Sequence, residues 1–166
     1  MYNPITISNF FIQEYGNDNN ITPMRLVKLV YLSHGWYLGL TGKALIDENP
    51  EAWQYGPVIP TVYHYYKAFR SSPIKNTTNF NNYNLEINPT DLKFLRSVWN
   101  TYKNYSAVEL SAMTHQVGTP WFITWNNMSH NKFTLGLNNK QIPDNLIKEH
   151  YQEKIELLNK KKQEVS

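Results

Sequence analysis

The sequence of 166 residues contains no cysteine. This absence excludes a disulfide framework, a thiolate nucleophile and any zinc site with cysteine ligands, although it does not constrain the redox compartment. Long apolar runs are missing too, since no stretch approaches the roughly 18 residues of a membrane-spanning helix, and no charged-then-apolar leader is visible. We therefore expect neither secretion nor a membrane span, and we expect a cytoplasmic location.

The sequence marks of common enzyme classes are also absent. There is no GxxxxGK[ST] phosphate loop, no GxGxxG and no GxSxG motif, and the histidines form neither HxH nor HExxH. Carboxylates do gather at Asp47, Glu48 and Glu51, where they could bind magnesium or share a proton, but a solvated acidic turn is far commoner. We expect no catalytic site, no metal, no cofactor and no enzymatic activity.

The excess of positive over negative side chains is small, since the net charge is only +3. Basic residues cluster in one place, Lys160 to Lys162. At a solvated helix end these cations would suit the negative end of the helix dipole, and this interpretation is favoured over nucleic-acid binding.

What the sequence has in quantity is apolar and aromatic side chains, at 41% and 14% of the residues. They favour a globular fold, and the length fits one domain. The richest stretch begins at Thr22 and Pro23, a cap residue followed by proline at the first helical position, and Gly42 ends it. Apolar residues surround almost the whole circumference between these points, so the pattern predicts a central, buried helix.

A short extended segment and turn are predicted near residues 44–59. Trp53 and Tyr55 alternate as in a strand, Pro50 should prevent regular pairing in the acidic turn, and Gly56 permits an unusual backbone turn. Pro60 then opens another helix.

The remaining capping and periodicity signals predict a mainly α fold, a compact helical bundle of about six helices around the central one. Gly16 is expected to end the first helix in a left-handed conformation, and Ser106 with Glu109 has capping-box spacing. Residues 71–88 and 126–141 read as polar loops, the first with a possible short strand at 83–87. The predicted helices span residues 1–16, 22–41, 60–70, 88–102, 107–117, 119–125 and 143–158.

Three groups of residues carry a resemblance to a known family. They are the LxKLxY pattern from Leu26 to Tyr31 after Thr22-Pro23, the AWxYGPVxPxVY run from Ala52 to Tyr63, and Thr114-His115 with Pro120-Trp121. Together they resemble the Panacea domain family, an antitoxin-associated domain long catalogued as a domain of unknown function. The middle run is the specific part, and the match covers most of the chain. On this basis residues 1–166 form one Panacea-like domain, with 71–88 a surface loop and 159–166 a basic C-terminal tail.

The resemblance implies a helical bacterial or phage protein that neutralises a toxin encoded beside it. Neutralisation by direct protein–protein binding is the leading hypothesis. An adaptor that delivers the toxin or another partner to a cellular protease is the alternative, and a nucleic-acid-binding regulator is the second alternative. The expected partner is thus a cognate toxin protein, with a protease as a further possibility.

Candidate partner-binding residues follow from residue type. Arg25 and Lys28 interrupt the apolar surface of the central helix, so they either pair with carboxylates such as Asp47 or Glu51 or face an acidic partner. Aromatic residues often anchor interfaces, although the favoured interpretation is that Trp53, Tyr55 and Trp121 lie mostly in the hydrophobic core. The candidate set is Arg25, Lys28, Trp53, Tyr55, Phe80 and Tyr83.

Most residues of the family pattern are expected to be structural. His115 in particular is expected to hydrogen-bond the backbone near the next turn and to hold the helix start at Thr119-Pro120, since no partner acid or nucleophile can be named for it. The set comprises Thr22, Pro23, Leu26, Lys28, Leu29, Tyr31, Ala52, Trp53, Tyr55, Gly56, Pro57, Val58, Pro60, Tyr63, His115, Pro120 and Trp121.

Overall fold

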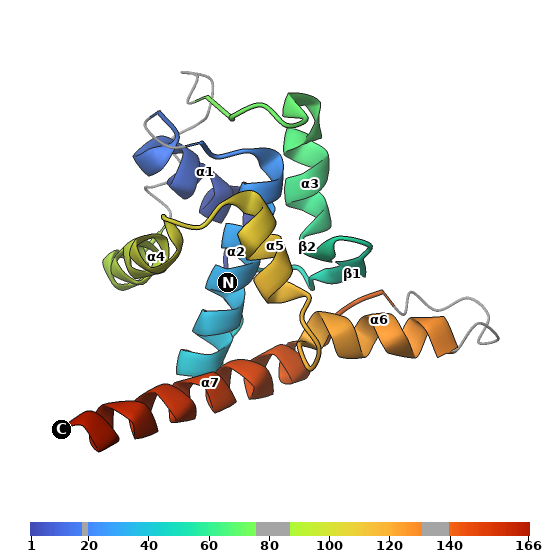
Figure 1. Ribbon diagram of the computed structural model, residues 1–166. Coiled ribbons are helices and arrows are strands. Elements are labelled where there is room, and N and C mark those ends of the chain that lie inside the picture. Colours follow the sequence, from blue (N-terminus) through green and yellow to red (C-terminus); the bar gives the residue numbers. More distant parts are fainter. Residues whose placement is uncertain (18–19, 76–86, 131–139) are drawn as a thin grey trace.

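A computed structural model describes residues 1–17, 20–75, 87–130 and 140–166. These residues are mainly helical, as predicted, with one short β-hairpin (Figure 1). The elements in chain order are α1 (Pro4–Tyr15), α2 (Pro23–Thr41), β1 (Glu51–Trp53), β2 (Gly56–Val58), α3 (Pro60–Tyr66), the 3-10 helix η1 (Lys67–Phe69), α4 (Pro89–Tyr102), α5 (Ala107–Thr114), α6 (Pro120–His130) and α7 (Asp144–Val165).

Helix α2 is the centre of the fold. The hydroxyl of Thr22 accepts from the amide of Arg25 at its start, and Gly42 ends it in a left-handed conformation with φ 70°. Helices α1, α3, α4, α5 and α7 all pack against it. Because it is covered on so many sides, even its polar residues Arg25, Lys28, Ser33 and His34 are buried. The prediction of a buried central helix is therefore confirmed.

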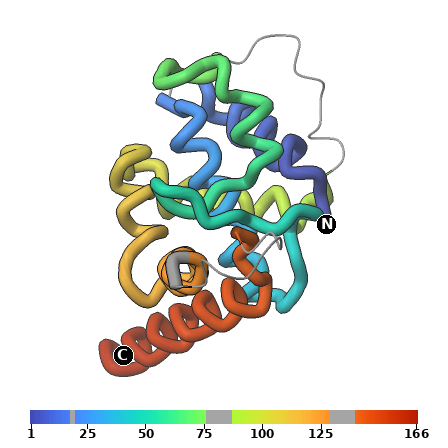
Figure 2. The backbone as a smooth tube through the Cα atoms, turned by 90° about the vertical axis from the view of Figure 1, so that its right-hand side faces the viewer, coloured from blue at the N-terminus to red at the C-terminus, as the bar shows by residue number. Residues whose placement is uncertain are grey.

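Helix α7 makes the most extensive contacts with α2. Its Tyr151 ring lies against Gly35 and packs edge-on against Trp36, while the Cβ and backbone of Tyr151 lie against Gly39; the missing side chains of the two glycines leave room for these contacts. His34 pairs with Asp144 at the start of α7, with 2.9 Å between Nε2 and Oδ1. Beyond these contacts the C-terminal end of α7 projects from the body of the molecule (Figures 1 and 2).

Strands β1 and β2 form an antiparallel hairpin in which Glu51 faces Val58 and Trp53 faces Gly56. The outer edge of β1 is also covered, because the Ala52 amide donates to the Lys140 carbonyl and the Ile142 amide to the Pro50 carbonyl. Pro50 itself lies outside both strands, as expected for a residue without an amide, but its carbonyl still accepts a bond and regular pairing begins at the next residue, Glu51.

Several helix ends differ from the prediction. Gly16 follows α1 but is right-handed, with φ −67°, and its amide bonds the Ile12 carbonyl. Helix α6 continues to His130 and α7 to Val165, through polar residues that were read as loop and tail. The helix start at Pro60 and the capping box of Ser106 and Glu109 are confirmed.

Parts of the two predicted loops cannot be compared with the structure. Residues 76–86 and 131–139 lie outside the described residues, and so do most of the possible strand at 83–87 and the candidate residues Phe80 and Tyr83. Within the described residues, no helix combines the length and the apolar character needed to cross a membrane.

Candidate functional site

Lys28 is a buried anchor between α2 and the hairpin. Its Nζ donates to the Tyr55 carbonyl at 3.0 Å and to the Pro57 carbonyl at 2.9 Å. Burial lowers the pKa of Lys28 to about 7. A side chain at Gly56, where φ is 108°, would place its Cβ 2.7 Å from this Nζ. The sequence had suggested that Lys28 pairs with a carboxylate of this chain or faces an acidic partner. In the structure its ammonium group instead donates to two main-chain carbonyls.

Arg25 has a similar role at the other side of α2. Its Nη2 donates to the Lys103 carbonyl at 2.6 Å, its Nη1 to the Asn20 carbonyl at 3.3 Å, and its guanidinium lies over the Trp99 ring. The expected pairing with Asp47 or Glu51 was wrong for this residue as well. Arg25 therefore ties the start of α2 to the end of α4.

A hollow of about 570 Å³ lies between α2, the hairpin and α3. We call it the α2–α3 groove. One wall is Met24, Val27 and Lys28 of α2, at helical spacings of three and four residues. Its volume falls within the roughly 300–1,000 Å³ of typical binding sites.

The opposite wall carries Tyr63 of α3, Lys67 of η1 and Arg70 directly after η1, which are spaced at i, i+4 and i+7 in the sequence. The end of the groove is formed by the hairpin turn from Trp53 to Tyr55 together with Val58. Two helix faces and one hairpin thus enclose it on three sides.

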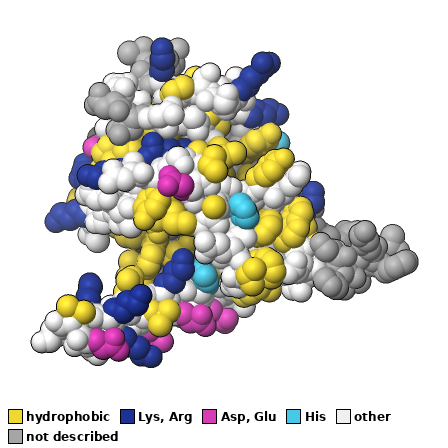
Figure 3. All heavy atoms as spheres, in the orientation of Figure 1, with side chains coloured by type: hydrophobic (Ala, Val, Ile, Leu, Met, Phe, Trp, Pro, Cys, Tyr) yellow, Lys and Arg dark blue, Asp and Glu magenta, His cyan; other side chains and the backbone are white. Residues whose placement is uncertain are grey.

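Aromatic rings dominate the groove. The Trp53 ring packs edge-on against Tyr63 at 4.9 Å between centroids, and its indole nitrogen donates to Glu51. Tyr55 is 67% exposed at the rim and Tyr63 is 37% exposed. In Figure 3, hydrophobic side chains gather over the part of this face where α3 and the hairpin lie, with Lys and Arg side chains above them.

All charged side chains that line the groove are basic. Lys67 and Arg70 are exposed at its end, while Lys28 is buried in its wall. Within the described residues the ion pairs are His34 with Asp144 and Arg96 with Glu14, so the cations of the groove have no carboxylate partner there.

The backbone of Arg70 adopts φ 54° and ψ −116°, a conformation that L-residues rarely take. Strained residues of this kind cluster at active sites and ligand-binding segments, and here the strain lies at the end of an exposed wall.

The acidic turn has structural roles. The Glu48 carboxylate accepts from the Thr61 amide in the first turn of α3, and the Glu51 carboxylate accepts from the Trp53 indole. Glu48 thereby supplies a negative charge at the positive end of α3, whose own N-cap residue Ile59 has no side-chain acceptor. Within the described residues, no group of three or more His, Asp or Glu side chains is placed to hold a metal ion.

His115 contacts side chains. Its Nδ1 lies 3.5 Å from the Ser111 hydroxyl, and its ring packs edge-on against Trp121. The expected bond to the backbone of the next turn is not the contact that the structure gives. Trp121 instead ties the first turn of α6 to the hairpin, because its indole nitrogen donates to the Trp53 carbonyl at 2.7 Å.

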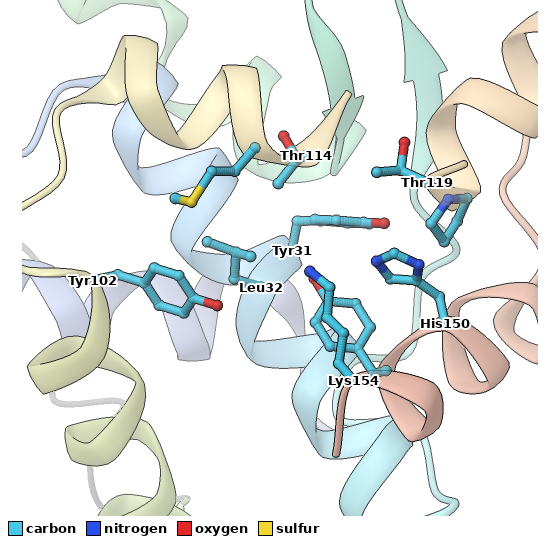
Figure 4. Close-up of a pocket in the computed structure, with 10 residues that line it drawn as sticks. Tyr31, Leu32, Tyr102, Thr114, Thr119, His150 and Lys154 are labelled. Atoms are coloured by element: carbon cyan, nitrogen blue, oxygen red, sulfur yellow. The ribbon is translucent and has the colours of Figure 1, made fainter. Parts of the chain in front are cut away.

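A second, much smaller cavity lies where α2, α5 and α7 meet (Figure 4). Tyr31, His150 and Lys154 point into it, and burial together with the charge of Lys154 lowers the pKa of His150 to about 4. Its volume is about 30 Å³, enough for one or two waters but not for an organic ligand. The groove is therefore the better candidate site.

The structure divides the predicted residues by exposure. Of the candidate partner-binding set, Trp53 and Tyr55 line the groove near its rim, Lys28 lies in its wall, and Arg25 lies away from it. Of the family pattern, Thr22, Trp53, Pro60 and His115 are partly exposed, and Tyr55 and Tyr63 are exposed. The remaining members, Pro23, Leu26, Lys28, Leu29, Tyr31, Ala52, Gly56, Pro57, Val58, Pro120 and Trp121, are buried.

Met24, Lys67 and Arg70 were missed as site residues, and Tyr63 was assigned a structural role only. The available signal was the i, i+4, i+7 spacing of Tyr63, Lys67 and Arg70, which places an aromatic residue and two cations at exposed positions of α3 and of the segment that follows it.

Comparison with known proteins gives two matches. A family model described as "Antitoxin SocA-like, Panacea domain" matches residues 26–122. A protein named Antitoxin SocA, from Caulobacter vibrioides (strain NA1000 / CB15N), is 31% identical over 142 residues, which cover 81% of this chain and 73% of that protein. No solved structure matches this chain. The matched span contains the hairpin, α3 and most of α2, and it ends before α7.

Proposed function

Since this chain belongs to the family of SocA-like antitoxins with a Panacea domain, we propose that it neutralises a cognate toxin by binding it directly at the α2–α3 groove. The observation that carries the proposal is the groove itself, which lies almost wholly inside the matched span and exposes aromatic side chains at its rim.

Physical chemistry favours this face for protein binding. Tyr and Trp are enriched among the residues that supply most of the energy of an interface, and exposed aromatics above an apolar hollow can be desolvated by a partner. Trp53 and Tyr63 already pack against each other, and this contact reduces the side-chain entropy that would be lost when a partner covers them.

The experiment is co-expression with the product of the adjacent reading frame, followed by growth measurement and purification of the complex. Wild-type chain should restore growth and purify with the toxin. Tyr63→Ala should weaken the complex by at least about 1 kcal/mol, as for a typical interface anchor. Tyr65→Ala is the matched control, because Tyr65 is 56% exposed on the same helix but does not line the groove.

The other outcomes distinguish the alternatives. A protease adaptor would shorten the half-life of the toxin in cells, whereas masking leaves the half-life unchanged or longer. A nucleic-acid binder would bind DNA or RNA with an affinity that falls steeply with salt and that drops when Lys160 to Lys162 are neutralised. Absence of both rescue and complex formation by the wild-type chain contradicts the proposal.

A further inference from the structure

The main-chain groups of the hairpin limit which kind of partner segment can bind in the groove. The carbonyls of the hairpin are already occupied: Trp121 donates to Trp53, Lys28 and Ser111 donate to Tyr55, and Lys28 also donates to Pro57. Pro57 has no amide to offer. An extended peptide laid along this hairpin would find few partners for its own main chain, which is costly once water is excluded.

The outer edge of β1 gives no alternative, since Lys140 and Ile142 already pair with the segment from Pro50 to Ala52. Addition of a strand from a partner is therefore disfavoured on both sides of the hairpin. A helix has no such requirement, because its main-chain groups bond within the helix. The groove is thus suited to a helical segment that it recognises through side chains.

The walls of the groove indicate which side chains the partner helix should carry. Met24 and Val27 on α2 and Trp53 and Tyr63 opposite them present apolar surface, which calls for an apolar stripe on the partner helix. At the α3 end, Lys67 and Arg70 are exposed and have no carboxylate partner within the described residues. Carboxylates on the partner helix would complement them.

We infer that the α2–α3 groove binds an amphipathic helix of the toxin, with its apolar stripe between α2 and α3 and its acidic residues against Lys67 and Arg70. This inference rests on the proposed function and names the segment of the partner that the groove takes. The cations steer the acidic helix and fix its direction, while the aromatic rings supply most of the affinity.

The test is charge reversal in the full chain. Lys67→Glu with Arg70→Glu should lower the affinity for the purified toxin about tenfold or more, mainly through slower association, and the loss should shrink as salt is raised. Both residues are exposed, so the variant should fold, which a thermal melt checks. Lys160→Glu with Lys162→Glu is the matched control, since it makes the same change of charge on the exposed end of α7.

Overlapping peptides of about 20 residues from the toxin then locate the segment, because this length permits a stable helix. The peptide that binds should gain helical circular dichroism with the wild-type chain, and replacement of its acidic residues by lysine should restore affinity for the charge-reversed variant.

The outcomes separate this inference from the proposed function. If the wild-type chain binds the toxin and both charge variants bind it equally well, the inference is wrong and the proposed function stands. An extended, non-helical bound peptide also contradicts the inference. If the wild-type chain binds no toxin, the proposed function itself fails.

Discussion

The burial of Lys28 should make the free energy of unfolding depend on pH. Its pKa is about 7 in the folded protein and 10.5 for ordinary lysine, so between these values the unfolded chain binds more protons. The free energy of unfolding should therefore rise with pH across this window, by at most about 1.4 kcal/mol per pH unit. The rise should end near pH 10, where tyrosines ionise in the unfolded chain while burial raises the pKa of Tyr31 in the fold.

Urea denaturation of Lys28→Met between pH 7 and 10 checks this prediction. The variant should lose most of the slope, and it should be less stable at pH 9 by about 1–3 kcal/mol because the Pro57 carbonyl loses its donor. The exposed Lys67→Met serves as control and should keep the slope. A wild-type stability that is flat over this range would show that Lys28 is not buried as described.

Arg70 allows backbone strain to be measured separately from charge. Arg70→Gly and Arg70→Ala both remove the guanidinium, but only glycine adopts φ 54° without a steric cost. Arg70→Gly should therefore be more stable than Arg70→Ala by about 1 kcal/mol or more in denaturant melts. Equal stability, or a more stable alanine variant, would mean that the position is not strained.

At the scale of elements, the contact between α2 and α7 depends on two missing side chains. A Cβ at Gly35 would run into the Tyr151 ring. Gly35→Ala should thus destabilise the fold by about 1–3 kcal/mol through overpacking, although alanine favours the helical state by about 1 kcal/mol.

A double-mutant cycle tests this explanation. Combined with Tyr151→Leu, which removes the ring, Gly35→Ala should cost less than it does alone, and the coupling between the two sites should exceed about 0.5 kcal/mol. Additive effects would place the cause elsewhere.

The elements themselves were largely predictable, because their signals are local. Thr22-Pro23, Ser106 with Glu109, and Gly42 each act within one helical turn, and each marks an observed boundary. The predicted end of helix α7, at residue 158, was too early because no local signal marks the true end at Val165. Its last turns bury nothing and lack an apolar stripe, yet residues of good helix propensity such as Leu157, Leu158 and Lys160 to Lys162 continue the helix.

The candidate site was predicted only in part, because it depends on contacts between distant segments. Lys28 could be recognised as an exception on an apolar helix, but its acceptors are carbonyls 27 and 29 residues away, set by a hairpin that the sequence did not define. Trp53 and Tyr55 were identified by residue type. The groove between them and Arg70 required the packing of α3 against α2.

For the whole molecule, the structure separates a packed body from the projecting end of α7. Residues 159–166 are all exposed, whereas Ile147 and Tyr151 anchor the first turns of the helix. Deletion of 159–166 should change the free energy of unfolding by no more than about 0.5 kcal/mol. Tyr151→Ala should cost about 3–5 kcal/mol. Urea titrations compare the two.

The same deletion should leave growth rescue intact, since it removes none of the residues that line the groove. Loss of rescue with an unchanged stability would assign the function to the basic end of α7 instead.

Trp53 gives the molecule its own optical reporter. It is the tryptophan that lines the groove, and its indole is only partly shielded from water. A segment seated above it should shift its fluorescence emission to shorter wavelengths, and Trp53→Phe should abolish that shift while the other tryptophans continue to emit. Occupancy could then be followed in a cuvette without attaching any dye.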